Sequence, residues 1–157
     1  MNKSKTNNDS RTEISHILFE KHMNSVGRLF GGQLLMWIDE VAGIVAKRHC
    51  EGRCTTACID NLQFKEACHL GDIIVLVGYL TYVGRSSMEV RIDTYVEKSD
   101  GKRHPVNRAF FVMVALDDND KPIEVPRLKI STIEEQAKWD AAKKRIQLRN
   151  ERREEGF

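Results

Sequence analysis

The stretch from Asn24 to Lys47, NSVGRLFGGQLLMWIDEVAGIVAK, is a glycine-rich turn that leads directly into an unusually apolar segment. Between residues 34 and 46 only Asp39 and Glu40 are charged, and the apolar side chains are spread round the whole helical wheel. Such a helix is predicted to be buried on nearly all sides. Because an unpartnered buried carboxylate is costly, a carboxylate near the middle of this helix needs a structural partner or a chemical role.

The length and charge of the chain limit the possible classes of protein. Its 157 residues fit one domain with a core of its own. The 25 Lys and Arg residues against 23 Asp and Glu residues give a formal net charge of +2, so nothing points to nucleic acid or an anionic membrane. The first residues, MNKSKTNNDSRTE, lack the apolar region of a signal peptide, and no stretch reaches the ~18 apolar residues of a membrane span. We expect a soluble cytoplasmic protein with no membrane insertion.

Cysteine is concentrated in one short region, with two histidines beside it. The spacing C-x3-C-x3-C matches no common zinc pattern. We therefore expect no metal, and reduced thiols that pack as small apolar side chains; a metal-binding module is the weaker alternative. The residues concerned are Cys50, Cys54, Cys58, Cys68, His49 and His69.

The rest of the chain predicts mostly strands. Residues 1–12 are polar and predict a disordered tail, so the domain is expected to span residues 13–130 and to begin with a strand in ISHILFEKH. One long helix follows the glycines and ends before Gly52. Beyond it, runs rich in valine, isoleucine, threonine and tyrosine predict further strands, two of which form a hairpin. These strands are residues 55–65, 72–83, 87–99 and 106–117.

Residues 131–157 predict a charged C-terminal helix with a capping box in STIEE, residues 131–135. Its acidic and basic residues alternate, which favours a solvated, weakly docked helix over an RNA-binding arm. One long apolar helix beside a largely antiparallel sheet is an α+β arrangement, with the helix on the concave face. The apolar sides that a single sheet leaves uncovered predict at least a dimer.

One motif carries a family resemblance: N-x-x-G-x-x-F-G-G-x-x-x-x-x-x-D. The chain resembles the hotdog-fold acyl-CoA thioesterases, in the branch of bacterial YciA-like enzymes and the cytosolic acyl-CoA hydrolases of animals. The segments VGRSSMEVRI and AFFVMVALD also look like that branch, and the similarity spans residues 14–126. It implies a helix wrapped by an antiparallel sheet, a homodimer with two active sites at its interface, and often a hexamer built as a trimer of dimers. The motif residues are Asn24, Gly27, Phe30, Gly31, Gly32 and Asp39.

The resemblance implies hydrolysis of acyl-CoA to a free acid and coenzyme A, without a cofactor. Thioester hydrolysis needs a polarised carbonyl, a positioned water and a carboxylate that activates the water or attacks directly. Backbone N–H groups at a helix start suit a developing oxyanion, and Gly31 and Gly32 would let the carbonyl approach them. We expect the Gly32 amide to be the main donor, and the resemblance gives Asn24 the task of orienting water or the thioester.

Asp39 lies seven residues beyond Gly32, or about 10 Å along the helix, which is too far for one carbonyl. Asp39 of one subunit is therefore expected to serve the carbonyl held by Gly32 of the other, as general base or as nucleophile. The plainer alternatives are that Asn24 is only a turn residue and that Asp39 is satisfied by neighbouring groups. Glu40 points elsewhere on the wheel and is expected to have no catalytic role.

Coenzyme A carries phosphates, which call for arginine, hydroxyls and exposed amides. The turn Gly84-Arg85-Ser86-Ser87 offers all three and is our leading coenzyme A contact; the alternative is a plain hairpin turn. Arg108 and Arg127 are weaker candidates, since either could pair with a neighbouring acid.

Two other functions compete with hydrolysis. A non-catalytic acyl-CoA sensor would bind at the same interface but has no evident need for Asn24 and Asp39. A hotdog dehydratase would require a catalytic histidine with an acidic partner, and none of the five histidines replaces the Asp39 position.

Overall fold

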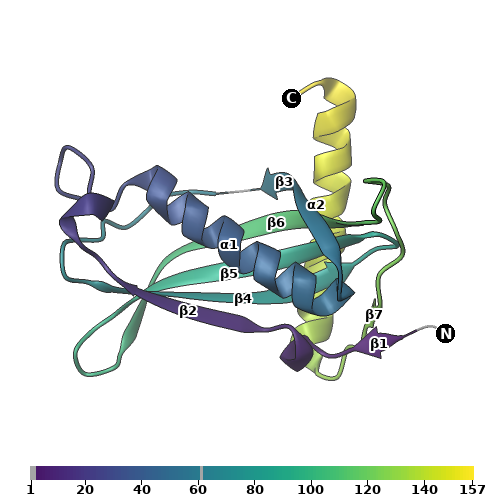
Figure 1. The fold of residues 1–157 in the computed structure, drawn as a ribbon, viewed down its shortest axis with the longest axis horizontal. Coiled ribbons are helices and arrows are strands. Elements are labelled where there is room, and N and C mark those ends of the chain that lie inside the picture. The colour runs from purple at the N-terminus through teal and green to yellow at the C-terminus, as the bar shows by residue number, and fades with distance from the viewer. Residues whose placement is uncertain (1–2, 61) are drawn as a thin grey trace.

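A five-stranded antiparallel sheet curls around one long helix (Figure 1). The computed structural model describes residues 3–60 and 62–157. The helix, α1 (Gly31–Cys50), lies on the concave face and contacts all five strands, which confirms the α+β prediction. In spatial order the strands are β2 (Thr12–Ile17), β4 (Ile73–Val83), β5 (Ser87–Glu97), β6 (Arg103–Leu116) and β3 (Arg53–Asp60).

The inner face of α1 forms the core together with the inward-facing side chains of the sheet. Trp37, Ile38 and Val41 are buried in one cluster with apolar residues of β4, β5 and β6. Gly78 of β4 allows the helix to come close, because a Cβ there would lie 2.5 Å from Val41 Cγ1. Glycine at this position thus sets the distance between helix and sheet.

The opposite face of α1 is open in the single chain. Met36 is 50% exposed, and Gly32, Asp39, Glu40 and Lys47 are also exposed. The prediction of a helix buried on nearly all sides is therefore wrong for one chain alone, because the sheet covers only one face of the helix. The carboxylate in the middle of α1 sits on the uncovered face.

The predicted disorder of residues 1–12 is wrong for residues 3–12, and residues 1 and 2 lie outside the described part. Strand β1 (Ser4–Lys5) pairs in parallel with β7 (Arg127–Leu128), and the short helix η1 (Asn7–Asp9) follows. Asn7 Oδ1 accepts a hydrogen bond from the Leu80 N–H at 3.0 Å. Polar composition suggested solvation, but these side chains bond to the sheet and to the end of α1.

Two predicted strands are shorter than expected. The first strand stops at Ile17, and η2 (Glu20–His22) replaces its predicted second half. The strand predicted over residues 55–65 ends at Asp60. The predicted hairpin of β4 and β5 is confirmed by their antiparallel pairing, which runs from Ile73 to Val83 with one register shift between Leu80 and Tyr82.

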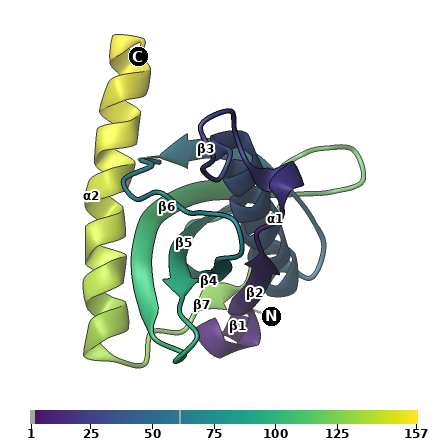
Figure 2. The same cartoon turned by 90° about the vertical axis from the view of Figure 1, so that its left-hand side faces the viewer.

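The C-terminal helix α2 (Ile133–Glu155) lies on the outer face of the sheet, on the side opposite α1 (Figure 2). The capping box is confirmed: Thr132 Oγ1 accepts from the Glu135 N–H at 3.1 Å. The Trp139 ring packs on Tyr82 with centroids 4.3 Å apart. Weak docking is wrong for this helix, because buried ion pairs also join it to the sheet. No helix of residues 3–60 and 62–157 has the length and apolar character to cross a membrane.

Candidate active site

The motif residues fall into two groups at different places on the chain. The first group lies at the start of α1, beside a pocket of about 290 Å³ that Asn24 and Gly31 line and Gly32 does not. Asn24, Gly31 and Leu34 line it on one side, and the segment from Phe64 to Cys68 lines it on the other. The second group is centred on Asp39, two helical turns further along.

Asn24 both builds the turn and keeps its side-chain NH2 group available. Its Oδ1 accepts from the N–H groups of Val26 and Arg28, both at 3.0 Å, and its own N–H donates to the Arg28 carbonyl at 2.7 Å. These bonds fix the side-chain amide, so the turn role considered from the sequence is real. Within the described residues the Nδ2 group donates to no protein acceptor, which leaves two N–H groups for a ligand.

The first turn of α1 presents unpaired amides. Phe30 precedes the helix without a side-chain cap, and the first amide to bond backwards is that of Leu34, to the Phe30 carbonyl at 3.1 Å. The N–H groups of Gly31 and Gly32 find no acceptor in the part of the chain that is described. A Cβ at Gly32 would lie 2.6 Å from Phe30 Cε1, so any larger residue there would require the Phe30 ring to move. This end of the helix can bind a developing negative charge.

Among residues 3–60 and 62–157, Asp39 has one side-chain hydrogen-bond partner, Thr56, which the sequence did not predict. Thr56 Oγ1 of β3 donates to Asp39 Oδ1 at 2.6 Å, and it also lies 3.5 Å from Met113 Sδ. The bond orients the carboxylate, and no described residue donates a hydrogen bond to Oδ2, which can therefore act on a ligand. A threonine facing inward from a predicted strand was the available signal, but the sequence does not say which helical residue it meets.

The turn predicted to hold coenzyme A lies elsewhere in the chain. It joins β4 to β5 beside β7, at the end of the sheet away from the start of α1 (Figure 1). The Gly84 N–H donates to the Ser87 carbonyl at 2.8 Å, and the Ser86 carbonyl accepts from Ala115. The Arg85 side chain is exposed. One chain therefore does not bring this turn to Asn24 or Gly32.

The two weaker arginine candidates are occupied. Arg127 Nη2 donates to the carbonyl oxygens of Gly84 and Val125, which braces the turn from β7. Arg108 Nε donates to Asp93 Oδ1 at 3.2 Å. This is the pairing with a neighbouring acid that the sequence offered as the alternative.

A larger pocket, of about 520 Å³, lies where β6 extends past the end of β3. Asp93, Asn107 and Arg108 line it, together with Lys65 and Glu66 from the wall of the smaller pocket. It contains none of the motif residues. Size alone therefore does not identify the candidate site, and the smaller pocket is the one that the motif residues Asn24 and Gly31 line.

Cys68 lines the smaller pocket, but neither the cysteines nor the histidines have the features of a nucleophile or a base. All four cysteines are free, and burial raises the pKa of both Cys54 and Cys68 to about 11. Those two thiols stay protonated near neutral pH, which disfavours a thiolate nucleophile. Among the described residues no histidine ring hydrogen-bonds a carboxylate; His49 Nε2 bonds the Pro126 carbonyl at 2.8 Å, and the His16 ring stacks on Trp37. In the same residues no group of His, Cys, Asp and Glu could hold a metal ion.

Comparison with known proteins identifies the class. Residues 26–101 match the family model described as "Thioesterase superfamily". The chain is 37% identical over 146 residues to the uncharacterized acyl-CoA thioester hydrolase YkhA of Bacillus subtilis, covering 92% of this chain and 83% of that protein. The chain belongs to the thioesterase superfamily, and its fold is the hotdog thioesterase fold.

Animal relatives are longer. The cytosolic acyl coenzyme A thioester hydrolase of Rattus norvegicus is 32% identical over 148 residues, which cover 91% of this chain but 39% of the rat protein. This chain thus corresponds to less than half of that relative.

Solved structures agree closely with this fold. An acyl-CoA hydrolase from Staphylococcus aureus, in complex with butyryl coenzyme A, coenzyme A and coenzyme A disulfide, has a TM-score of 0.92 and 31% identity, covering 98% of this chain and 94% of that chain. An apo-hexameric acyl-CoA thioesterase has a TM-score of 0.91 and 34% identity, covering 96% and 97%. Alanine variants of the S. aureus enzyme at an asparagine, an aspartate and a threonine have the same fold.

Proposed function

We propose that the protein hydrolyses acyl-CoA thioesters to a carboxylic acid and coenzyme A, at two equivalent sites between the subunits of a homodimer. The main support for this proposal is the separation of Gly32 and Asp39 along one exposed face of α1. Gly32 and Asp39 are seven residues apart, so they share that face but lie about 10 Å from each other. One substrate carbonyl can contact both a Gly32 N–H and an Asp39 carboxylate only if the two residues belong to different subunits.

In this site the substrate carbonyl oxygen accepts a hydrogen bond from the Gly32 N–H. The Nδ2 group of Asn24 donates a hydrogen bond that orients the thioester or the water. The partner subunit's Asp39 either takes a proton from the attacking water or attacks the carbonyl itself, giving an anhydride that water then opens. In both routes the tetrahedral oxyanion is stabilised by amides that exist before the substrate arrives. The C–S bond breaks, the proton goes to the thiolate, and Asp39 is returned as a carboxylate.

We assign Thr56 the role of orienting Asp39. The assignment is supported by its 2.6 Å hydrogen bond and by the variants of the S. aureus enzyme. The asparagine, aspartate and threonine replaced in those variants are separated by 15 and 17 positions, the same separations as Asn24, Asp39 and Thr56 in this chain.

The assembly and the remaining contacts follow from the same arrangement. The hexameric relatives support a hexamer built from dimers. The turn from Gly84 to Ser87 would meet the coenzyme A phosphates only from a neighbouring subunit, because within one chain it lies beyond the other end of α1. We propose no cofactor other than the coenzyme A of the substrate itself, and a cytoplasmic location like that named for the rat relative.

The test is thiol release from a panel of acyl-CoAs of increasing chain length, assayed with one preparation of the protein and a thiol reagent. We expect turnover of at least part of the panel, and Asp39→Ala should abolish it while the fold and the oligomer stay intact. Tight binding without thiol release would favour the acyl-CoA sensor. Undiminished turnover by the variant would contradict the assigned mechanism.

A further inference from the structure

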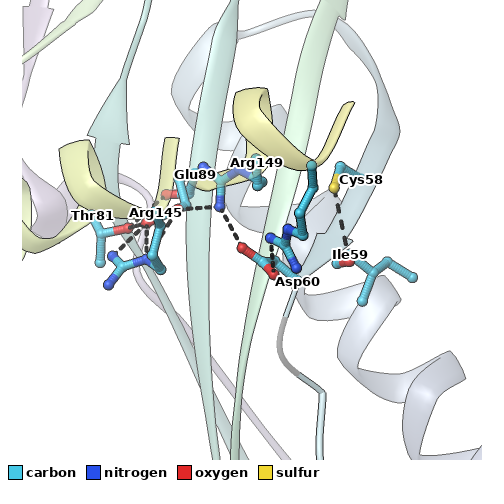
Figure 3. A network of polar contacts seen from close by, with 8 residues as sticks. Cys58, Ile59, Asp60, Thr81, Glu89, Arg145 and Arg149 are labelled. Atoms are coloured by element: carbon cyan, nitrogen blue, oxygen red, sulfur yellow. Dashed lines mark hydrogen bonds and ion pairs between the residues drawn. The ribbon is translucent and has the colours of Figure 1, made fainter. Parts of the chain in front are cut away.

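A cluster of buried charges joins α2 to the outer face of the sheet (Figure 3). Asp60, the last residue of β3, is 3% exposed, and Glu89 of β5 is 2% exposed. Arg149 Nη1 reaches both carboxylates, at 3.1 Å from Asp60 Oδ2 and 2.9 Å from Glu89 Oε2. Buried carboxylates persist as ions only when such partners compensate for the lost water.

Each carboxylate also has partners of its own. Arg152 Nη2 lies 2.8 Å from Asp60 Oδ1. Glu89 Oε1 accepts from Arg145 Nη2 at 2.7 Å and from Thr81 Oγ1 at 2.6 Å. Asp60 and Glu89 are therefore matched in burial and in kind of partner. They differ in place: Glu89 lies within a strand paired on both sides, whereas Asp60 ends an edge strand that, among the described strands, pairs with β6 alone.

The end of β3 needs such an anchor. The pairing of β3 with β6 shifts register at a bulge between Thr56 and Cys58, and beyond it only Cys58, Ile59 and Asp60 remain paired. A bulge redirects the side chains beside it, and a short run after a bulge is held by few hydrogen bonds. Thr56, at the start of this bulge, is the residue that holds Asp39.

Asp60 also lies shortly before the segment from Phe64 to Cys68, which lines the smaller pocket. Phe64 follows Asp60 by four residues, and its ring lies 3.5 Å from the position of a Cβ on Gly31. Asp60 thus stands between Thr56, which contacts one half of the proposed site, and Phe64, which covers the other half.

We propose that Asp60, held by Arg149 and Arg152 of α2, is a positioning residue for the hydrolysis: α2 fixes the end of β3, and with it the direction in which Thr56 presents its hydroxyl to Asp39. The inference rests on the proposed function. It makes α2 a part of the catalytic framework, although no residue of α2 belongs to the proposed reaction centre.

The experiment compares Asp60→Asn with the matched control Glu89→Gln. Both changes are isosteric and both break buried ion pairs with α2, so both should lower the Tm. Only Asp60→Asn should lower kcat strongly, by at least about tenfold with KM changed less than about threefold, because small displacements of catalytic groups are costly. Glu89→Gln should keep kcat within about twofold of the unaltered protein. Equal losses of kcat in the two variants would overturn the inference.

A second comparison excludes a purely structural role. In a Thr56→Ala background, Asp60→Asn should cause little further loss of kcat, because the hydroxyl that it positions is gone. Losses that multiply in the double variant would contradict action through Thr56. If Asp60→Asn does not fold, Arg152→Gln, which removes the half-exposed partner, takes its place, with a smaller loss that should also vanish in the Thr56→Ala background. Absence of turnover in the unaltered protein would instead refute the proposed function.

Discussion

Substitution of Gly32 by alanine separates the chemistry of the helix start from its stability. The new methyl would lie 2.6 Å from Phe30 Cε1 and 3.2 Å from Cζ, so the ring must move by roughly 1 Å to reach an ordinary carbon–carbon contact. Phe30 is 55% exposed and can swing into solvent. Alanine is also favoured over glycine in a helix by ~0.5–1 kcal/mol. We expect the free energy of unfolding to change by less than about 1 kcal/mol.

Activity should respond much more strongly than stability. The methyl stands beside the N–H that we propose as the oxyanion donor, and loss of one such donor typically costs about 10²–10³ in kcat, or roughly 2.7–4 kcal/mol. Thiol release gives kcat, and urea unfolding gives the stability of the same preparation.

The double variant Phe30→Ala/Gly32→Ala is the control, because it removes the ring and keeps the methyl. Its kcat should stay far below that of Phe30→Ala alone. Recovery to the level of Phe30→Ala would mean that the displaced ring, and not a blocked amide, caused the loss.

Three further predictions test the site, the core and a buried histidine. Thr56→Val removes the donor to Asp39 and should lower kcat by about 10- to 100-fold with little change in KM, since a hydrogen bond to a charged group contributes ~1.5–3 kcal/mol. Gly78→Ala should destabilise the fold by ~1–3 kcal/mol in urea unfolding, and Val41→Ala should restore part of that loss. Burial lowers the pKa of His49, so the unfolded chain binds its proton more readily, and stability should fall as pH drops below about 6.5; an equal acid slope in His49→Gln would contradict this.

Local patterns predicted the central helix and the β4–β5 hairpin, because helical and strand periodicities depend only on residues that are close in the sequence. The motif residues at the start of α1 are likewise close to one another in the sequence. Thr56 could not be found in this way, since its contact with Asp39 spans 17 residues and depends on how β3 packs under α1. A single hydroxyl in a strand rich in threonine and cysteine carries no local signal of its partner.

The order of residues 3–12 and the firm docking of α2 were mispredicted for a related reason. Their polar residues look solvated, but their partners are distant: Lys5 donates to the Arg48 carbonyl, and Arg149 pairs with Asp60, 89 positions away. An alternation of acidic and basic residues predicts a solvent-exposed helix, but it does not show that one of the arginines faces a buried carboxylate. Only the tertiary structure shows that pairing.

The most direct test of the central claim is subunit complementation between two inactive variants, Asn24→Ala and Asp39→Asn. A mixed dimer has one site with both residues intact and one with neither. Random pairing of equal amounts makes half of the dimers mixed, so the co-assembled protein should regain about a quarter of the unaltered kcat per subunit. Thiol release at that level would support a site shared between subunits; a mixture no more active than either variant alone would contradict it.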